Sequence, residues 1–84
     1  MKWRVVIRPE VETDITEAVQ WYEERESGLG AKFLNEVFAV WDALTINPLL
    51  NARRHPHKNI RWRYPEHFPY RIVYEVIEAE HTVV

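Results

Sequence analysis

The alternation of apolar and polar positions is clearest between Phe68 and Val76, where the chain reads Phe-Pro-Tyr-Arg-Ile-Val-Tyr-Glu-Val. β-Branched and aromatic residues dominate this run from Tyr70 onward, as they do in pleated and partly covered strands. Because side chains alternate between the two faces of a strand, one face is predicted to be apolar while the other carries Arg71. Pro69 can open a strand but not occupy its middle, so we expect this strand to begin near Tyr70.

Residues 2–7 and 60–64 show the same alternation in shorter runs and are also predicted to be strands. Their apolar sides would be formed by Trp3, Val5 and Ile7 in the first strand and by Ile60, Trp62 and Tyr64 in the second. Residues 81–84 predict a fourth strand. It is shorter than the usual length of about five or six residues, so we expect the last strand to be cut short.

Between the first two strands, apolar residues recur every three or four positions, which is typical of amphipathic helices. Pro9 suits the first position of a helix, and the pattern predicts a helix over residues 9–26. Gly28 and Gly30 interrupt the pattern, and a second helix is expected from there to residue 46, ended by Pro48. Two helices joined this tightly form an antiparallel hairpin.

Together these elements predict an α+β fold in the order strand, helix, helix, strand, strand and short strand. The two-helix hairpin would pack on one face of a small, mostly antiparallel sheet, against the apolar side of each strand. Alternation then gathers basic residues from different strands on the opposite face, namely Arg4, Arg61, Arg63 and Arg71. Such a face would suit a polyanion or an acidic protein segment.

Composition limits the scale and the compartment of the protein. Eighty-four residues make one small domain, residues 1–84. There is no cysteine, which excludes disulfides and thiolate metal sites and fits a reducing compartment. Arg4 and Arg8 interrupt the apolar residues near the start of the chain, so neither a signal peptide nor a membrane span is predicted. We therefore expect a cytoplasmic protein.

The net charge of −2 conceals an asymmetry along the chain. Residues 1–50 hold five Lys or Arg and nine Asp or Glu, giving −4, whereas residues 51–84 hold six and four, giving +2. One face or edge of the fold is therefore expected to be basic. The acidic outer side of the first helix would keep nucleic acid away from the hairpin, so a polyanion should meet the sheet.

Each candidate residue also has a structural interpretation. Arg71 could pair with Glu75, whereas Arg61 and Arg63 would repel each other on one strand face unless an anion lay nearby. Several aromatic residues lie at helical spacing and are most simply core, although an incompletely covered one could form a groove for a partner. They are Trp21, Phe33, Phe38 and Trp41.

The histidines do not have the spacing of a metal site. His55 and His57 lie on an extended loop with no identifiable third ligand, so no metal and no cofactor are predicted. His67, close to Arg71 in sequence, stays a candidate general acid because histidine titrates near neutrality.

Three parts of the chain together resemble the RelE/ParE toxin superfamily of type II toxin–antitoxin modules. They are Trp21-Tyr22-Glu23-Glu24 before Gly28-Leu29-Gly30, Asn47-Pro48 after the second helix, and the run from Phe68 to Val76. The resemblance covers nearly all 84 residues, and the helix hairpin is most similar to the ParE branch. It implies a growth-inhibiting toxin, of the kind associated with plasmid stabilisation, that a cognate antitoxin neutralises.

The resemblance implies two alternative toxic mechanisms. ParE-like members inhibit DNA gyrase without bond chemistry of their own, and this is the function we predict. RelE-like members enter the ribosome and cut mRNA; on this alternative Arg71 matches a sheet arginine that contacts phosphate, and Arg61 and Arg63 match paired lysines. Binding of target or antitoxin would further involve Arg4, Trp21 and Trp41.

The short last strand opens a third hypothesis. The nucleases use a further arginine on the last strand and often a tyrosine in a C-terminal helix, and residues 1–84 contain neither. The chain could therefore be a degenerate domain that binds antitoxin without harming the cell. An incompletely paired sheet edge would also recruit a strand from a partner. The sequence leaves two oligomeric states open, a homodimer and a heterotetramer with antitoxin.

Overall fold

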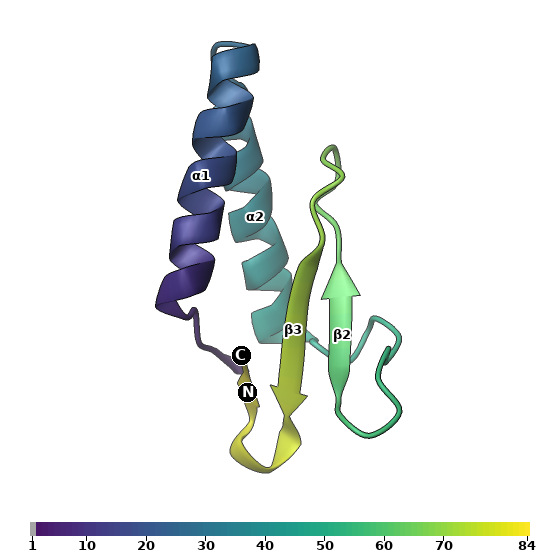
Figure 1. The fold of residues 1–84 in the computed structure, drawn as a ribbon. Helices are drawn as coiled ribbons and strands as arrows, with labels where there is room; N and C mark the ends of the chain where they lie inside the picture. The colour runs from purple at the N-terminus through teal and green to yellow at the C-terminus, as the bar shows by residue number, and fades with distance from the viewer. Residues whose placement is uncertain (1) are drawn as a thin grey trace.

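The computed structural model describes residues 2–84 and has two layers, a helical hairpin and a four-stranded sheet (Figure 1). Its elements in chain order are β1 (Arg4–Val5), α1 (Pro9–Arg25), α2 (Leu29–Ile46), β2 (Ile60–Arg63), β3 (Ile72–Ile77), the short 3-10 helix η1 (Glu78–Glu80) and β4 (Thr82–Val83). The predicted α+β class and element order are confirmed. The strands are shorter than predicted, and β3 begins at Ile72 rather than near Tyr70.

The sheet has the strand order β1-β4-β3-β2, so the last strand in sequence lies between the first and the third. β4 pairs parallel with β1, with Val5 opposite Val83, and antiparallel with β3, with Val76 opposite Val83. β2 pairs antiparallel with β3 at the other edge, with Arg61 opposite Tyr74. The sheet is therefore mostly antiparallel, and only β1 runs parallel to its neighbour.

Two glycines form the tight connection between the helices. Gly28 has a φ of 89°, a left-handed conformation that a residue without a Cβ adopts readily, and it caps the start of α2. Gly30 has an ordinary helical φ, but a Cβ there would lie 2.7 Å from the carbonyl oxygen of Val19 on α1. The Glu23 carboxylate accepts hydrogen bonds from the backbone N–H groups of Gly28 and Gly30, at 3.0 Å each. It thereby satisfies donors at the start of α2 that have no partner within the helix.

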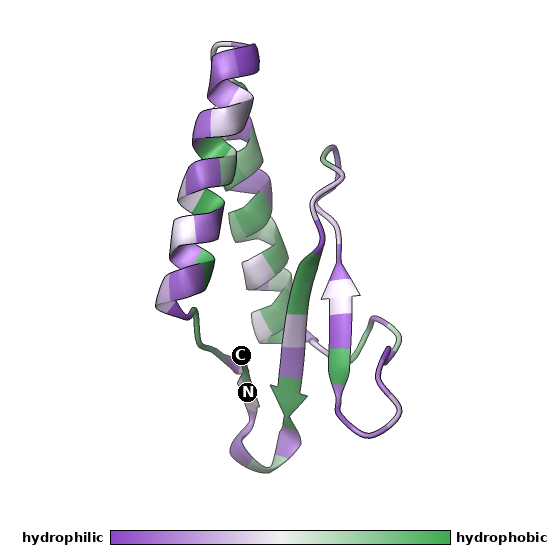
Figure 2. Ribbon diagram, in the orientation of Figure 1, coloured by the Kyte–Doolittle hydropathy of each residue, from purple (hydrophilic) through white to green (hydrophobic). Residues whose placement is uncertain are grey.

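The core lies on both sides of α2, which separates α1 from the sheet. One cluster of buried residues joins the C-terminal half of α2 to the sheet and consists of Val40, Leu44, Tyr74, Val76 and Val83. The other joins α1, α2 and the segment before β3, and consists of Ile15, Phe33, Val37 and Phe68. Figure 2 shows hydrophobic residues along α2 and β3, whereas α1 carries many hydrophilic ones. α2 and β3 therefore form the centre of the fold.

Two of the aromatic residues predicted as core lie at the surface instead. The exposed fraction is 50% for Trp21 and 46% for Phe38, whereas Phe33 is fully buried and Trp41 is partly buried. The helical spacing places all four in an apolar stripe, but α1 packs mainly against α2 and much less against the sheet, so the hairpin is not covered on every apolar side. The core prediction is therefore confirmed for Phe33 and wrong for Trp21 and Phe38.

A hydrogen-bonded pair joins the loop between β2 and β3 to α2. One carboxylate oxygen of Glu36 accepts a hydrogen bond from the backbone N–H of His67 at 2.8 Å, and the other lies 2.8 Å from the ring Nδ1. Desolvation would raise the pKa of Glu36, but the two hydrogen bonds and the attraction of His67 outweigh it and hold the pKa below its ordinary value.

We expect this pair to make stability depend on pH. Because the folded state lowers the pKa of Glu36, the stabilisation is present above the ordinary pKa of a glutamate and is lost as the pH falls through the lowered value. Denaturant unfolding across this range should show wild type more stable than Glu36→Gln near neutral pH, with the difference disappearing in acid. Glu66→Gln is the matched control, since Glu66 lies 3.9 Å from the other ring nitrogen and is exposed. An equal pH dependence in both variants would contradict the assignment.

Candidate functional site

Arg61 on β2 holds the loop that follows α2. Its guanidinium donates hydrogen bonds to the carbonyl oxygens of Leu49, at 3.0 Å, and Asn51, and its Nε donates to the side chain of Asn59 at 2.8 Å. The opposite residue, Tyr74, takes part in the same loop, because its hydroxyl donates to the carbonyl oxygen of Pro48 and accepts from the Asn51 amide. The loop 48–51 is therefore pinned to the sheet by polar contacts from both strands.

The predicted phase of β2 is wrong, and the four arginines do not share a face. Arg61 lies opposite Tyr74 and Arg63 opposite Ile72, and residues opposite each other in a ladder point to the same side of the sheet. Tyr74 and Ile72 pack on the helix side, so both arginines lie there. Trp62, predicted as core, lies on the open side instead.

Local packing explains why this phase is reversed. β2 is an edge strand that has little contact with the helices, and its helix side meets the loop 48–51. That loop presents carbonyl oxygens, which favour a guanidinium over an indole. The apolar residue consequently turns to the open face, where arginine side chains cover it. A prediction from hydrophobicity alone therefore places Trp62 on the wrong side of this edge strand.

The open face of the sheet carries a surface that we call the Trp62–Arg71 surface, made of Trp62, Arg71 and Val73. The guanidinium carbon of Arg71 lies 4.5 Å from the centre of the Trp62 ring, and that of Arg54 lies 5.0 Å from it. Val73 is opposite Trp62 and 55% exposed. Within residues 2–84 no carboxylate lies within 4.0 Å of Arg71, so the predicted pair with Glu75 does not form. Arg71 is thus held by stacking on an aromatic ring.

Arg4 lies on the same open side but toward the other edge. Arg4 lies opposite Thr82 of β4, and Thr82 lies opposite Ile77 of β3. Ile77 is four residues after Val73 in β3 and therefore points to the same, open side of the sheet. Its side chain is exposed. Of the four arginines expected to converge, Arg4 and Arg71 share the open side and Arg61 and Arg63 share the other.

Trp21 lines a groove between α1 and the segment before β3, which we call the acidic groove. Its walls are formed by Asp14, Glu17, Ala18, Trp21, Tyr22 and Tyr70. Burial raises the pKa of the Tyr70 hydroxyl, and the nearby Asp14, Tyr22 and Glu17 raise it further, in decreasing order. Arg25 stacks on the far end, its guanidinium carbon 3.3 Å from the Trp21 ring centre. Carboxylates beside aromatic faces suit a cationic side chain.

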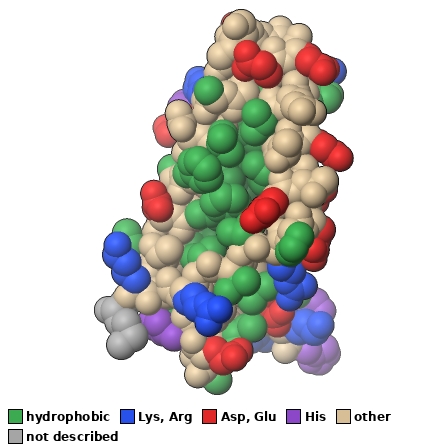
Figure 3. All heavy atoms as spheres, turned by 90° about the vertical axis from the view of Figure 1, so that its left-hand side faces the viewer, with side chains coloured by type: hydrophobic (Ala, Val, Ile, Leu, Met, Phe, Trp, Pro, Cys, Tyr) green, Lys and Arg blue, Asp and Glu red, His purple; other side chains and the backbone are tan. Residues whose placement is uncertain are grey.

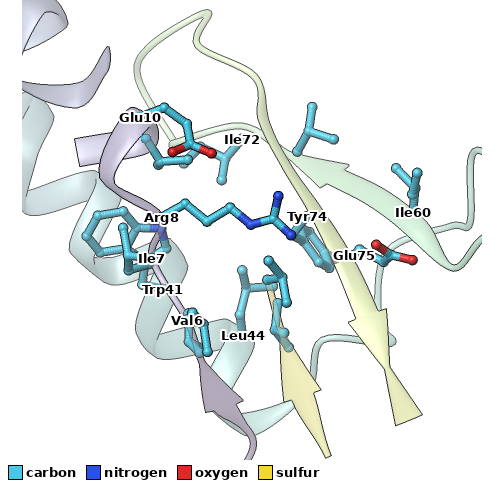
Figure 4. A pocket seen from close by; sticks show the side chains of 15 residues that line it. Val6, Ile7, Arg8, Glu10, Trp41, Leu44, Ile60, Ile72, Tyr74 and Glu75 are labelled. Carbon is cyan, nitrogen blue, oxygen red and sulfur yellow. The ribbon is translucent and has the colours of Figure 1, made fainter. Parts of the chain in front are cut away.

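Trp41 lines a cavity of about 290 Å³ between β3 and the connection from β1 to α1. Figure 4 shows Trp41 and Leu44 of α2 together with Tyr74 of β3 around this cavity, and the Arg8 side chain reaching across it toward Tyr74. We call it the β3 cavity. Its lining is largely apolar, and Arg8, Glu10 and Glu75 supply the charges at its border.

One face of the molecule also exposes apolar side chains. Figure 3 views the side of the hairpin and shows an apolar band bordered by carboxylates, with Lys or Arg near its lower end. Exposed apolar residues of α2 and the loop after it include Phe38, Ile46, Leu49 and Leu50. Large exposed apolar areas are typical of surfaces that bind other proteins.

The sequence did not single out Arg8, Asp14, Glu17 or Tyr70 as site residues. Arg8 directly precedes the helix-starting Pro9, and Asp14 and Glu17 were interpreted as solvated helix surface. The only sequence signal for the acidic groove is that two carboxylates precede Trp21 by seven and four positions, about two turns and one turn of helix. No signal within α1 indicates that Tyr70 closes the groove.

The structure offers no cluster of three or more metal-ligating side chains within residues 2–84. His55 and His57 face each other across 6.2 Å between ring centres, and the His55 ring accepts backbone hydrogen bonds from its own loop. In the same part of the chain, neither helix is long and apolar enough to cross a membrane.

Comparison with known proteins identifies one family. The family model described as ParE toxin of type II toxin-antitoxin system, parDE, matches residues 5–84. No curated protein and no solved structure is significantly similar to the chain. The match begins at Val5, the second residue of β1, and includes every later element described above.

Proposed function

This chain belongs to the ParE toxin family of type II toxin–antitoxin systems, and we propose that it inhibits DNA gyrase when no antitoxin is bound. As a member of this family it is the toxin component, and a cognate antitoxin is its partner. The proposal concerns the target, for which the match to the ParE branch is the first support.

The Trp62–Arg71 surface is the observation that carries the proposal. Tryptophan and arginine are enriched among the residues that dominate binding energy at protein interfaces, and the exposed Val73 adds apolar area beside them. A toxin that acts by binding an enzyme needs such a docking surface and no reacting groups of its own. We propose that gyrase contacts this surface.

The nuclease alternative drew on Arg61, Arg63 and Arg71 acting together on RNA. Arg71 lies on the open side of the sheet, whereas the other two lie on the helix side, and Arg61 is engaged by loop oxygens. Phosphate bound at Arg71 would therefore be out of reach of Arg61. This geometry favours protein docking over RNA cleavage.

Purified gyrase tests the proposal directly. Chain freed from its antitoxin should inhibit supercoiling and accumulate cleaved plasmid, and Arg71→Glu should weaken this inhibition by about tenfold or more because it reverses the charge on the docking surface. Arg25→Glu is the matched control, because Arg25 also stacks on a tryptophan, Trp21, but lies on α1 and away from the proposed docking surface. This variant should leave the inhibition of gyrase unchanged.

Two results would contradict gyrase as the target. If the chain stops protein synthesis in a translation extract but does not inhibit gyrase, the result would favour the ribosomal nuclease. Antitoxin binding without inhibition of either system would favour the degenerate, non-toxic domain. Light scattering on the same samples distinguishes a homodimer from a heterotetramer with antitoxin.

A further inference from the structure

The outer side of β2 directs backbone groups away from the sheet. β2 lies at one edge, and β3 separates it from β4 (Figure 1). The N–H of Val76 on β3 donates to the carbonyl oxygen of Asn59 at 2.9 Å. In an antiparallel ladder, the backbone groups of successive residues point alternately toward the partner strand and away from it. Those of residues 59, 61 and 63 therefore point to β3, and those of Trp62 and Tyr64 point outward.

The loop before β2 covers only the start of this outer side. The N–H of Arg54 donates to the carbonyl oxygen of Ile60 at 2.7 Å, as expected if the even-numbered residues point outward. Further along β2, no backbone group within residues 2–84 bonds to the outward N–H and C=O of Trp62. Trp62 and Tyr64 thus form a free edge, which we call the β2 edge.

The surroundings of the β2 edge are basic. Residues 51–65 contain five Lys or Arg and no Asp or Glu. Arg54 lies over the Trp62 ring on the open side of the sheet, whereas Arg63 lies on the helix side. In the part of the chain that the structure describes, no carboxylate lies within 4.0 Å of either guanidinium. Cations without an anionic partner therefore flank the β2 edge on both sides of the sheet.

A second copy of the chain does not fit this edge. When two antiparallel edges pair, the outward-pointing residues lie opposite one another. If Trp62 lay opposite Trp62 of the second copy, Arg61 would lie opposite Arg63. If Trp62 lay opposite Tyr64, Arg63 would lie opposite Arg63. Like charges directly opposite are destabilising, so the edge favours a strand that carries carboxylates at these positions.

We propose that the β2 edge binds an extended acidic segment of a partner protein as an added antiparallel strand. Strand addition of this kind takes affinity from main-chain hydrogen bonds and specificity from alternate side chains. The antiparallel direction is chosen because antiparallel pairing is slightly more stable per residue than parallel pairing. The inference rests on the backbone of β2 and on the charges beside it, and does not depend on gyrase being the target.

The pairing determines the side-chain pattern of the segment. The residue opposite Trp62 points to the open side, where a β-branched side chain packs well beside an aromatic ring. Its two neighbours point to the helix side, opposite Arg63 and Arg61, and are acidic. Arg61 is already bonded to the loop after α2, so the carboxylate opposite Arg63 should contribute more. The centre of the segment is therefore acidic, β-branched, acidic.

A blocked peptide of the usual length of a strand, acetyl-Thr-Thr-Glu-Val-Glu-Thr-amide, tests the proposal. Its valine is placed opposite Trp62 and its first glutamate opposite Arg63. Titrated into isotopically labelled chain, it should bind saturably and shift the backbone resonances of Trp62 and Arg63. Exchange of the Trp62 amide hydrogen should slow by about tenfold or more, because that N–H gains a partner.

Two methylated peptides separate strand pairing from charge attraction. Methylation of the valine nitrogen removes the N–H that would donate to the carbonyl oxygen of Trp62, and it should abolish the protection. Methylation of the first glutamate nitrogen is the matched control, because that N–H points away from β2 in the proposed pairing. It should leave binding unchanged. Both peptides keep every side chain and the same net charge.

A charge exchange tests the position opposite Arg63. Replacing the first glutamate of the peptide with lysine should weaken binding by about tenfold, and Arg63→Glu in the chain should reverse this preference. Arg4→Glu is the matched control, because Arg4 lies on β1 at the other edge of the sheet, and it should leave the preference unchanged. Circular dichroism verifies that both variants are folded.

Four results would overturn the proposal. Equal binding of the two methylated peptides would show adhesion without strand pairing. Absence of binding at millimolar peptide would show that the edge is closed to partners. If an oligonucleotide of six thymidines binds more tightly than the peptide and leaves the Trp62 amide unprotected, the edge attracts phosphate instead of a strand. A Trp62 amide already protected before peptide is added would show that a second copy, or the protein's own chain, occupies the edge.

Discussion

Arg61→Glu should lower the free energy of unfolding by about 3 kcal/mol or more, because hydrogen bonds from a charged group contribute about 1.5–3 kcal/mol and this residue makes several. The variant also directs a carboxylate at the carbonyl oxygens of Leu49 and Asn51, which have no proton to offer it. A domain of this size has a total free energy of unfolding of about 4–13 kcal/mol. The variant would therefore lose a large share of its stability. Urea denaturation followed by circular dichroism measures the change.

Arg71→Glu is the control for this prediction. It makes the same exchange of charge on the same hairpin, but on an exposed side chain whose only contact of note is the face of Trp62. Its cost should be about 1 kcal/mol or less, the value of an exposed cation–π contact. Equal destabilisation by the two variants would show that Arg61 does not hold the loop after α2.

Gly30→Ala should produce the second large loss of stability, about 1–3 kcal/mol, the range found when a well-packed site is overfilled. The added Cβ would lie 2.7 Å from the Val19 carbonyl oxygen and 3.1 Å from the Glu23 side chain. The contact with a backbone atom cannot be relieved by rotating a side chain, so the two helices must move apart. Thermal unfolding should show a lower midpoint for the variant.

Gly28→Ala separates backbone conformation from packing at the same turn. A Cβ on Gly28 would meet nothing within 4 Å, but its φ of 89° is unfavourable for alanine, at a cost of about 1–2 kcal/mol. Gly28→Asn should recover part of this loss, because asparagine tolerates the left-handed region, whereas Gly30→Asn should recover none. Rescue of both positions by asparagine would mean that helix separation is not the cause.

Sequence periodicity predicted the helices almost to the residue, and it predicted the faces of β3. These elements have neighbours on one defined side, so hydrophobicity reports directly on burial, as for Tyr74 and Val76. The method failed at β2, where the neighbour on the helix side is a loop of carbonyl oxygens rather than a helix. Periodicity also gave a wrong prediction for Trp21, because an apolar stripe on a helix does not indicate how much of that stripe is covered by neighbouring elements.

The candidate sites were less predictable because they depend on contacts between distant segments. The pair of Glu36 and His67 joins α2 to the loop before β3, and no local pattern indicates it. The β3 cavity depends on the parallel pairing of β1 with β4, which the order of elements did not reveal. The sequence did predict a fourth strand after residue 80, and β4 (Thr82–Val83) lies there.

The strand order has a consequence for the order in which the sheet assembles. Among the elements of residues 2–84, the central strand β4 is synthesised last, yet it is the strand partner of β1, the first, with Arg4 opposite Thr82. Until β4 has been synthesised, no strand within residues 2–84 joins β1 to β3, and such sequence-distant pairings form slowly. The sheet formed by these four strands is therefore complete only after Val83 has been synthesised.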